Sequence, residues 1–371
     1  MSKPKHILVI RLSAMGDVAM TVPVLRALVL QYPEVKITVV SRPFFQPFFD
    51  GIPNVNFFGV DLKERHKGFV GLLRLFSDLR KLNIDAVADL HNVLRSKVVR
   101  TLFALSGKKV AATDKGRAEK KALTSLTNKV FAPVKSMVDR HVETFKQFGF
   151  SIDLANPHLP KKATLSEEIL SITGIKNQNW IGIAPFAQYE SKVYPLDLMQ
   201  QVIDGLAENK NQKIFLFGGG DKEIKLLNQL QNQHENVIVL AGKLKFKQEL
   251  DVISNLDIML SMDSGNAHIA AMLGVKVITL WGATHPYAGF KPFNQPDDFC
   301  LTSDREQFPL LPTSIYGNKK VEGYEDGKIQ TKVLYEFKEE GMKNGKIQGC
   351  LMKKNEITNK EKLLAAGYHT I

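Results

Sequence analysis

The chain opens with the apolar run His6-Ile-Leu-Val-Ile-Arg-Leu12 and continues with Ser13-Ala-Met-Gly-Asp17 and a helical pattern over residues 18–30. The first run is typical of a short buried strand, and the second is a turn of small residues that leads into a helix. Further strands are predicted over residues 36–40 and 86–90, and an amphipathic helix over residues 69–82. Strands and helices that alternate in this way predict a parallel sheet with helices on both faces.

The same alternation restarts after a polar stretch at residues 157–178. Strands are predicted over residues 180–184, 213–217, 237–240, 258–261 and 275–280, and helices over residues 195–208, 221–231, 246–255 and 265–273. The pattern predicts an α/β protein with two Rossmann-like domains facing a cleft, and ligands at the carboxyl ends of the strands. The N-terminal domain is predicted over residues 1–165 and the C-terminal domain over residues 166–371, with an insertion or extended loop at residues 312–356.

Length and composition exclude several classes of protein. The 371 residues are too many for one typical domain, and 44% hydrophobic with 24% charged residues is an ordinary globular composition. No apolar run approaches the ~18 residues that a membrane-spanning helix needs, and no secretory signal is visible. Two cysteines, Cys300 and Cys350, cannot build a disulfide framework. We therefore expect a cytoplasmic protein.

The net charge of +12 lies entirely in the first part of the chain. Residues 1–150 contain 25 Lys and Arg against 12 Asp and Glu, whereas residues 151–371 contain 25 against 26. The densest segment holds Arg95, Lys97, Arg100, Lys108, Lys109, Lys115, Arg117, Lys120 and Lys121. Such a patch suits a polyanion, an anionic membrane or a phosphorylated acceptor, and the alternative is a solvated face without a partner. Because the segment offers only Phe103 for base stacking, we expect no nucleic acid as partner.

The motif Arg11-Leu-Ser-Ala-Met-Gly-Asp17 places a carboxylate where the first strand ends and a helix begins. Gly16 allows a tight turn, and the amide groups of a helix start favour an ionised Asp17. A carboxylate in this position can act as a general base toward a substrate hydroxyl. The alternative is that Asp17 only caps the helix.

A second motif, Ser261-Met-Asp-Ser-Gly-Asn-Ala-His268, lies between a predicted strand and a predicted helix. Small residues at Ser264 and Gly265 leave free amide groups at the helix start, which is the usual arrangement for holding a phosphate. Asp263 and His268 lie within about one helical turn of that start. A plain capped helix is the alternative, and a zinc site is disfavoured because no second histidine follows four residues later.

Two further loops are candidates for ligand contact. Gly218-Gly-Gly-Asp-Lys-Glu223 lets a backbone approach a ligand while Asp221 or Glu223 accepts hydrogen bonds from ribose hydroxyls. Lys192 lies in a loop above the strand ends, where its ammonium can neutralise a departing phosphate, although lone loop lysines are usually only solvated.

Together these motifs resemble glycosyltransferase family 9, the ADP-heptose:lipopolysaccharide heptosyltransferases. The resemblance covers roughly residues 5–295 and implies the GT-B fold with its two Rossmann-like domains. Its motifs are the opening Ile-Arg-Leu-Ser-Ala-Met-Gly-Asp17, Asp89-Leu-His-Asn-Val-Leu-Arg-Ser96, Lys192-Val-Tyr-Pro195, Phe217-Gly-Gly-Gly-Asp221, Asp263-Ser-Gly-Asn-Ala-His268 and Leu280-Trp-Gly-Ala-Thr-His-Pro286.

The resemblance implies an inverting transfer of a sugar, with ADP-heptose as the family's usual donor. It implies that Asp17 is the general base and that Lys192 neutralises the donor phosphates. The implied donor-binding residues are Asp221 or Glu223, Asp263, Ser264, Gly265, His268 and Thr284. The sequence contains no Asp-x-Asp, which fits a reaction that needs no metal or cofactor and stabilises the leaving group with Lys192 and helix amides.

The resemblance also implies an acidic glycolipid acceptor, a lipopolysaccharide or lipooligosaccharide inner core. Such an acceptor implies peripheral contact with the cytoplasmic face of the inner membrane, with Arg95, Lys97 and Arg100 as acceptor contacts. Phe44-Phe-Gln-Pro-Phe-Phe49 is either an apolar lip that touches lipid or buried packing. Two alternatives remain open at this point, a GT-B-type nucleotide-sugar epimerase and a non-catalytic basic binding module.

Overall fold

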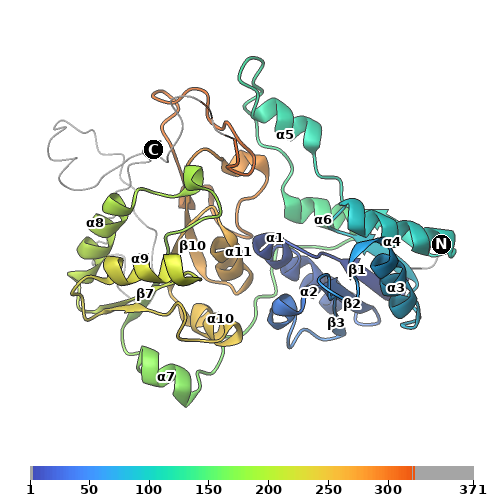
Figure 1. Ribbon diagram of the computed structural model, residues 1–371, viewed down its shortest axis with the longest axis horizontal. Coiled ribbons are helices and arrows are strands. Elements are labelled where there is room, and N and C mark those ends of the chain that lie inside the picture. Colours follow the sequence, from blue (N-terminus) through green and yellow to red (C-terminus); the bar gives the residue numbers. More distant parts are fainter. Residues whose placement is uncertain (1–2, 320, 322–371) are drawn as a thin grey trace. The chain divides into compact units, whose positions relative to one another are not determined.

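The computed structural model describes residues 3–319 and residue 321, which form two α/β units (Figure 1). Unit 1 comprises Met1–Arg117 and Lys135–Leu159, and unit 2 comprises Ala118–Val134 and Pro160–Ile371. The boundary at residues 159–160 lies a few residues before the predicted one at 165, and the segment Ala118–Val134 groups with unit 2 instead of unit 1.

Unit 1 is built on a five-stranded parallel sheet with the order β3-β2-β1-β4-β5. Its strands are β1 (His6–Ile10), β2 (Lys36–Ser41), β3 (Val55–Gly59), β4 (Ala86–Asp89) and β5 (Lys109–Ala112). Its helices are α1 (Met15–Ala19), α2 (Val22–Gln31), α3 (Gly68–Arg80), α4 (Leu94–Leu105) and α6 (Met137–Lys146). Leu8 and Ile10 of β1 pack in one core cluster with Leu72 of α3 and Phe103 of α4. Helices α3 and α4 therefore cover one face, while α2 and α6 contact each other, with α2 also contacting β2 and α6 contacting β5.

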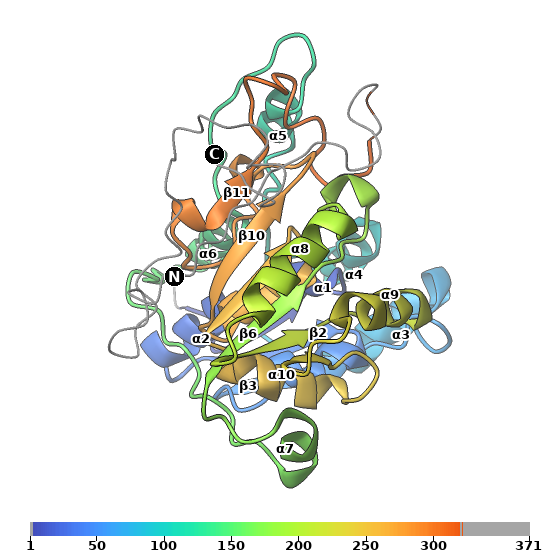
Figure 2. The same ribbon diagram turned by 90° about the vertical axis from the view of Figure 1, so that its left-hand side faces the viewer.

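Unit 2 is built on a six-stranded parallel sheet with the order β11-β10-β9-β6-β7-β8 (Figure 2). Its strands are β6 (Asn179–Ala184), β7 (Gln212–Leu216), β8 (Val237–Val239), β9 (Ile258–Met262), β10 (Lys276–Trp281) and β11 (Cys300–Thr302). Its helices are α7 (Glu167–Thr173), α8 (Leu196–Ala207), α9 (Asp221–Gln231), α10 (Phe246–Asn255) and α11 (Gly265–Met272). Ile203 of α8 and Leu227 of α9 are buried against Ile183 and Leu216 of the sheet.

The C-terminal part of the segment Ala118–Val134 packs against unit 2. The guanidinium of Arg305 lies 3.6 Å from the centre of the Phe131 ring, which also contacts the rings of His285 and Tyr287. Lys129 donates a hydrogen bond to the carbonyl of Pro312 at 2.8 Å. Helix α5 (Arg117–Leu123) begins this excursion.

The predicted helix over residues 18–30 is two helices, because the chain turns at Met20 and Thr21 and α2 restarts with Pro23 in its first turn. The 3-10 turn Pro43–Phe48 buries Phe45 and Phe48 and leaves Phe44 exposed, so packing accounts for most of this aromatic run. Of the predicted insertion at residues 312–356, residue 320 and residues 322–356 lie outside the described residues, as does Cys350. Among the helices described, none has both the length and the apolar character needed to cross a membrane.

Candidate functional site

Both sheets have the strand order that creates a binding crevice at one defined point. In unit 1 the chain order reverses between β1 and β4, and in unit 2 it reverses between β6 and β9. In doubly wound sheets, ligands bind outside the carboxyl ends of the strands at such a switch point. The segments that directly follow these four strands contain Asp17 (in α1), His91, Lys192 and Asp263.

In unit 1 the switch point holds an ion pair between Arg11 and Asp17. Arg11 Nη2 lies 2.7 Å from Asp17 Oδ2, and the same oxygen accepts a hydrogen bond from the amide of Ala14 at 3.2 Å. The other terminal nitrogen of Arg11 donates to the carbonyl of Leu90 at 2.7 Å. Arg11 is buried, whereas the Asp17 side chain is 28% exposed. Asp17 is therefore fixed in orientation and still accessible to a ligand.

The turn after β4 is organised by a buried carboxylate. Asp89 accepts hydrogen bonds from the amides of His91 and Asn92 at 3.1 and 2.7 Å, and its second oxygen lies 3.0 Å from Arg100 Nη1. The carboxylate is fully buried, so these contacts replace its hydration. Arg100 thus has a structural partner in Asp89, whereas Arg95 and Lys97 are exposed in the first turn of α4.

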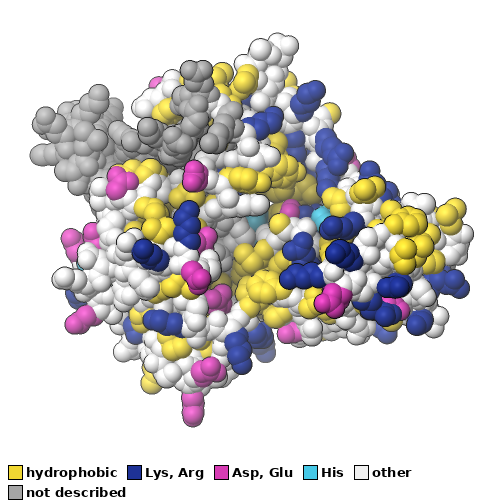
Figure 3. Space-filling model, viewed as in Figure 1, with side chains coloured by type: hydrophobic (Ala, Val, Ile, Leu, Met, Phe, Trp, Pro, Cys, Tyr) yellow, Lys and Arg dark blue, Asp and Glu magenta, His cyan; other side chains and the backbone are white. Residues whose placement is uncertain are grey.

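This turn presents His91, a residue to which the sequence analysis assigned no role. Within the described part of the chain, His91 Nδ1 is buried and lacks a hydrogen-bond partner. The pKa of His91 is lowered to about 3, chiefly by burial and then by the charges of Arg11 and Lys115. The pKa of Lys115 is itself lowered, first by burial and then by Arg11 and Arg117. Asp17 therefore lies among cations and one neutral imidazole, and Lys and Arg side chains also gather on the surface over α3 and α4 (Figure 3).

In unit 2 the switch point brings together three of the predicted residues. Lys192 Nζ lies 2.9 Å from Asp263 Oδ2, and Thr284 donates its hydroxyl to the same oxygen at 2.8 Å. All three side chains are largely buried. Lys192 ends the short 3-10 turn Glu190–Lys192 after β6, Asp263 follows β9, and Thr284 follows β10. These three side chains form a lysine–carboxylate–hydroxyl contact at the carboxyl ends of the strands.

Helix α11 begins directly beside this group. Ser264 is its N-cap residue but does not cap it with its side chain, because the Ser264 hydroxyl contacts the Ser261 hydroxyl at 3.1 Å. Gly265 is the first helical residue, and His268 is buried one turn later. The first amide groups of α11 are thus not covered by a side-chain cap and are suited to an anion.

Lys192 is held in place by residues that the sequence analysis did not single out. Ser191 accepts a hydrogen bond from the amide of Ala283 at 2.8 Å and donates its hydroxyl to the carbonyl of Gly317 at 2.6 Å. A Cβ on Gly282 would lie 2.3 Å from the Ser191 carbonyl oxygen, so only glycine fits there. A Cβ on Gly317 would lie 2.6 Å from Cγ and Cδ of Lys192. Backbone packing therefore fixes the lysine side chain.

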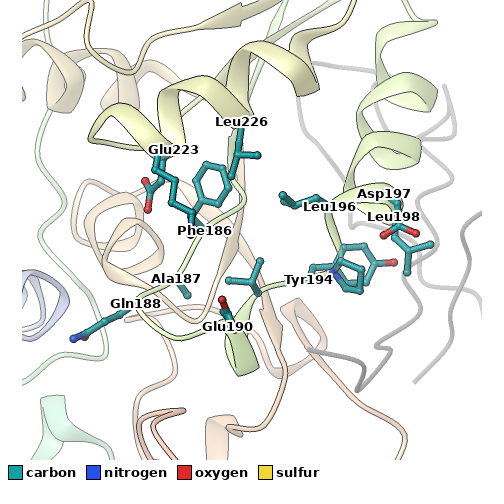
Figure 4. Close-up of a pocket in the computed structure, with 13 residues that line it drawn as sticks. Phe186, Ala187, Gln188, Glu190, Tyr194, Leu196, Asp197, Leu198, Glu223 and Leu226 are labelled. Atoms are coloured by element: carbon teal, nitrogen blue, oxygen red, sulfur yellow. The ribbon is translucent and has the colours of Figure 1, made fainter. Parts of the chain in front are cut away.

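The glycine-rich turn before α9 distinguishes the two acidic candidates. Glu223 Oε2 accepts a hydrogen bond from the amide of Gly219 at 2.8 Å, whereas Asp221 is exposed at the first helical position. Glu223 also lines a cavity of about 690 Å³ in unit 2 (Figure 4). Apolar and polar residues both line this cavity, among them Phe186, Leu196, Leu198, Leu226, Gln188, Glu190, Asp197 and Lys222.

Comparison with known proteins identifies the fold and the family. The model of glycosyltransferase family 9 (heptosyltransferase) matches residues 72–312. The lipopolysaccharide core heptosyltransferase OpsX of Haemophilus influenzae is 24% identical over 301 residues, which is 80% of this chain and 84% of that protein. Lipopolysaccharide heptosyltransferase 3 of Escherichia coli is 26% identical over 283 residues, 72% of this chain and 80% of that protein.

Two solved structures show the same architecture. A glycosyltransferase family 9 protein from Veillonella parvula superposes with a TM-score of 0.65 at 21% identity, covering 81% of this chain and 87% of that one. The E. coli heptosyltransferase WaaC with ADP superposes with a TM-score of 0.60 at 19% identity, covering 84% of this chain and 97% of that one. The predicted fold of two Rossmann-like domains of the GT-B type is thereby confirmed, and the chain belongs to glycosyltransferase family 9, the heptosyltransferases.

Proposed function

We propose that this glycosyltransferase transfers heptose from ADP-heptose, with inversion, to an anionic inner-core acceptor of lipopolysaccharide or lipooligosaccharide. Family membership supports glycosyl transfer in lipopolysaccharide core assembly. The observation that supports the division of labour is the presence of one ionic site at each switch point, Arg11–Asp17 in unit 1 and Lys192–Asp263 in unit 2.

On the donor side, Lys192 and the uncapped start of α11 would hold the diphosphate. Lys192 shares Asp263 Oδ2 with the hydroxyl of Thr284, so Asp263 keeps a partner when the ammonium turns to a phosphate oxygen. Ser264 and Gly265 supply backbone amides, and the buried His268 contributes a ring beside them. A cation and fixed amide dipoles stabilise the charge that develops on a leaving diphosphate.

The nucleoside would be held by the turn before α9. Of the two acidic candidates, we propose Glu223 as the ribose contact, because it lines the cavity and is oriented by the amide of Gly219. Asp221 is exposed at the start of α9 and would act through its charge alone. The apolar walls contributed by Phe186 and Leu226 suit the flat face of a purine base (Figure 4).

On the acceptor side, Asp17 would act as the general base. The acceptor hydroxyl oxygen forms a bond to the anomeric carbon of the donor while its proton passes to Asp17. The bond from the anomeric carbon to the diphosphate oxygen breaks, and its electron pair leaves with ADP. Attack from the face opposite the leaving group inverts the anomeric centre. Arg11 holds one carboxylate oxygen, which aims the second toward the acceptor.

The acidic groups of the acceptor would meet the basic surface of unit 1. Arg95 and Lys97 are exposed and free to extend, while Arg100 adds positive charge from its position beside Asp89. We further propose that the enzyme works in the cytoplasm in peripheral contact with the inner membrane, where a lipid-anchored acceptor would lie.

A thermal-shift screen against ADP, UDP, GDP, CMP, NAD and ADP-heptose tests the donor. A ligand at 100 times its Kd stabilises the fold by about 2.7 kcal/mol, which raises the melting temperature by several degrees. We expect a response to ADP and ADP-heptose alone, its loss in Asp263→Ala, and its retention in a control at the exposed Asp298, Asp298→Ala.

Other responses would overturn parts of the proposal. Stabilisation by UDP or GDP instead would exclude ADP-heptose, and no response to any nucleotide would exclude the donor site. If the nucleotide sugar were converted to its epimer in the absence of an acceptor, the activity would be epimerisation and not transfer. With a deacylated inner-core acceptor, product that retains the anomeric configuration would contradict a single displacement.

A further inference from the structure

Helices α3 and α4 expose large apolar side chains that the core of unit 1 does not use. Phe69, Val70 and Leu73 of α3 are 66%, 60% and 39% exposed, although Leu72 of the same helix is buried against the sheet. Leu94, the first residue of α4, is 79% exposed. Single exposed apolar residues are common, but a group of this size on adjoining helices indicates a binding surface.

The topology places these residues at one edge of the unit. Helix α3 connects β3 to β4 and α4 follows β4, so both helices run antiparallel to the strands of a parallel sheet. Both helices therefore begin at the carboxyl edge of the sheet, the edge that also bears Asp17 and His91. The two helices contact each other, and because both begin at the carboxyl edge, their first turns lie at the same edge of the sheet.

The charges around these apolar residues are almost all positive. The two helices contain five Lys and Arg residues and a single acid, Asp78. Asp78 is occupied by Arg65, whose guanidinium makes hydrogen bonds of 2.8–3.1 Å to its two oxygens. The basic side chains that border the apolar residues and are exposed are Lys67, Arg74, Arg95 and Lys97. In Figure 3, apolar side chains over the α3 and α4 region are bordered by Lys and Arg.

We infer that this α3–α4 surface, formed by Phe69, Val70, Leu73 and Leu94 with Lys67, Arg74, Arg95 and Lys97, docks on an anionic lipid bilayer. The apolar side chains would enter the interface while the cations meet lipid phosphates. An anionic bilayer is favoured over a protein partner because the positive charge of this surface has no acidic counterpart on the two helices other than Asp78, which is paired with Arg65. The inference rests on the proposed function for its biological sense: docking at this edge would place Asp17 next to a lipid-anchored acceptor.

Vesicle binding tests the inference without donor or acceptor. We expect the full chain to sediment with vesicles of phosphatidylcholine mixed with phosphatidylglycerol and much less with phosphatidylcholine alone. Phe69→Ser/Val70→Ser should lower the partition coefficient of the protein between water and the vesicles about tenfold or more. The matched control is Ile175→Ser, which removes an apolar side chain that is 76% exposed on unit 2 and should change nothing.

The charge contribution has its own pair of variants. Arg95→Gln/Lys97→Gln should lower binding to anionic vesicles about fivefold for each charge removed, and less at high salt. Lys225→Gln/Lys243→Gln removes two exposed lysines of unit 2 and should leave binding unchanged. Asp17→Asn, which should strongly slow transfer, is expected to bind vesicles like the wild type, so a failure of docking and a failure of the proposed chemistry are distinguishable.

A fluorescent reporter gives a second measurement. Trp180 and Trp281 are buried in unit 2, so Phe69→Trp adds a surface reporter to unit 1 whose emission should shift to the blue with phosphatidylglycerol vesicles. Ile175→Trp should show no such shift. Equal binding to neutral vesicles, wild-type binding by Phe69→Ser/Val70→Ser, or an unshifted Phe69→Trp spectrum would overturn the inference. So would a change of molecular mass in light scattering for Phe69→Ser/Val70→Ser, since it would assign this surface to a second copy of the chain.

Discussion

The two units of this molecule share a strand order around the switch point, but the charge balance at that point differs between them. In unit 2 the cation Lys192 lies against Asp263, and Thr284 completes the contact, so the site is close to neutral. In unit 1 the partly exposed carboxylate of Asp17 lies among Arg11, Lys115 and a neutral His91. The same scaffold therefore presents one site with balanced charges and one site with an excess of positive charge.

This difference in charge balance is consistent with a different ligand at each unit, as the proposed function requires. A balanced lysine–carboxylate contact can exchange partners with a diphosphate at little electrostatic cost, because Asp263 keeps its hydrogen bond from Thr284. A site with excess positive charge binds best when its ligand is itself anionic. This difference supports the proposal that the donor would bind to unit 2 and an acidic acceptor to unit 1.

The largest expected effect on activity comes from replacing the carboxylate of Asp17. Asp17→Asn keeps the size of the side chain and removes the base, so kcat should fall by about 10²–10⁴. The thermal shift caused by ADP should stay unchanged, because Asp17 belongs to unit 1 whereas the proposed nucleotide site lies in unit 2. Separate roles for the two units would be contradicted if Asp17→Asn also lost the ADP response, or if it kept the wild-type kcat. Asp50→Asn, at an exposed position of unit 1, is the matched control.

A smaller effect is expected from disturbing the backbone around Lys192. Gly317→Ala places a Cβ 2.6 Å from Cγ and Cδ of the lysine, so the ammonium must move away from its present position. Misplacing a catalytic group by about 1 Å typically costs up to ~10²-fold, and we expect kcat/KM to fall by about 10–100-fold. Gly107→Ala is matched in backbone strain, with φ +80° against +82° at Gly317, and has open space around its Cβ. Equal losses in the two variants would show that strain, not the displacement of Lys192, is responsible.

The sequence predicted the second unit better than the first, for a physical reason. The five strands predicted there are buried apolar runs between clear helices, and all five are present within a few residues. In unit 1 the edge strands β3 and β5 were missed because most of their residues are partly or fully exposed and include Asn56 and Lys109, which dilute the apolar pattern. Helix α4 was missed because basic residues interrupt it and its apolar side chains face both the core and solvent.

The sites show the same contrast. Asp263, Lys192 and Thr284 lie in quoted motifs, and the structure brings them together. The supporting residues Ser191, Gly282 and Gly317 act through backbone contacts between segments far apart in the chain, for which spacing gives no signal. His91 stood in a quoted motif, but its burial among cations depends on loops that only folding brings together.

The smallest effect concerns the pH dependence of unit 1. Since the native pKa of His91 is about 3 against an ordinary 6.5, the unfolded chain binds a proton below pH 6.5 that the native state does not, and stability falls as the pH falls. For a partly exposed side chain we expect about 1–2 kcal/mol of this loss between pH 7.5 and pH 5.

His91→Asn cannot take up that proton, so its melting temperature should decline less between these pH values than that of the wild type. His158→Asn, at an exposed position of the same unit, should decline like the wild type. An anionic acceptor analogue should narrow the gap between wild type and His91→Asn, because negative charge at this site lowers the cost of protonating the imidazole. Parallel declines in all three proteins would show that unit 1 does not confine a neutral histidine among cations, and the electrostatic contrast between the two switch points would then rest on Arg11 and Lys115 alone.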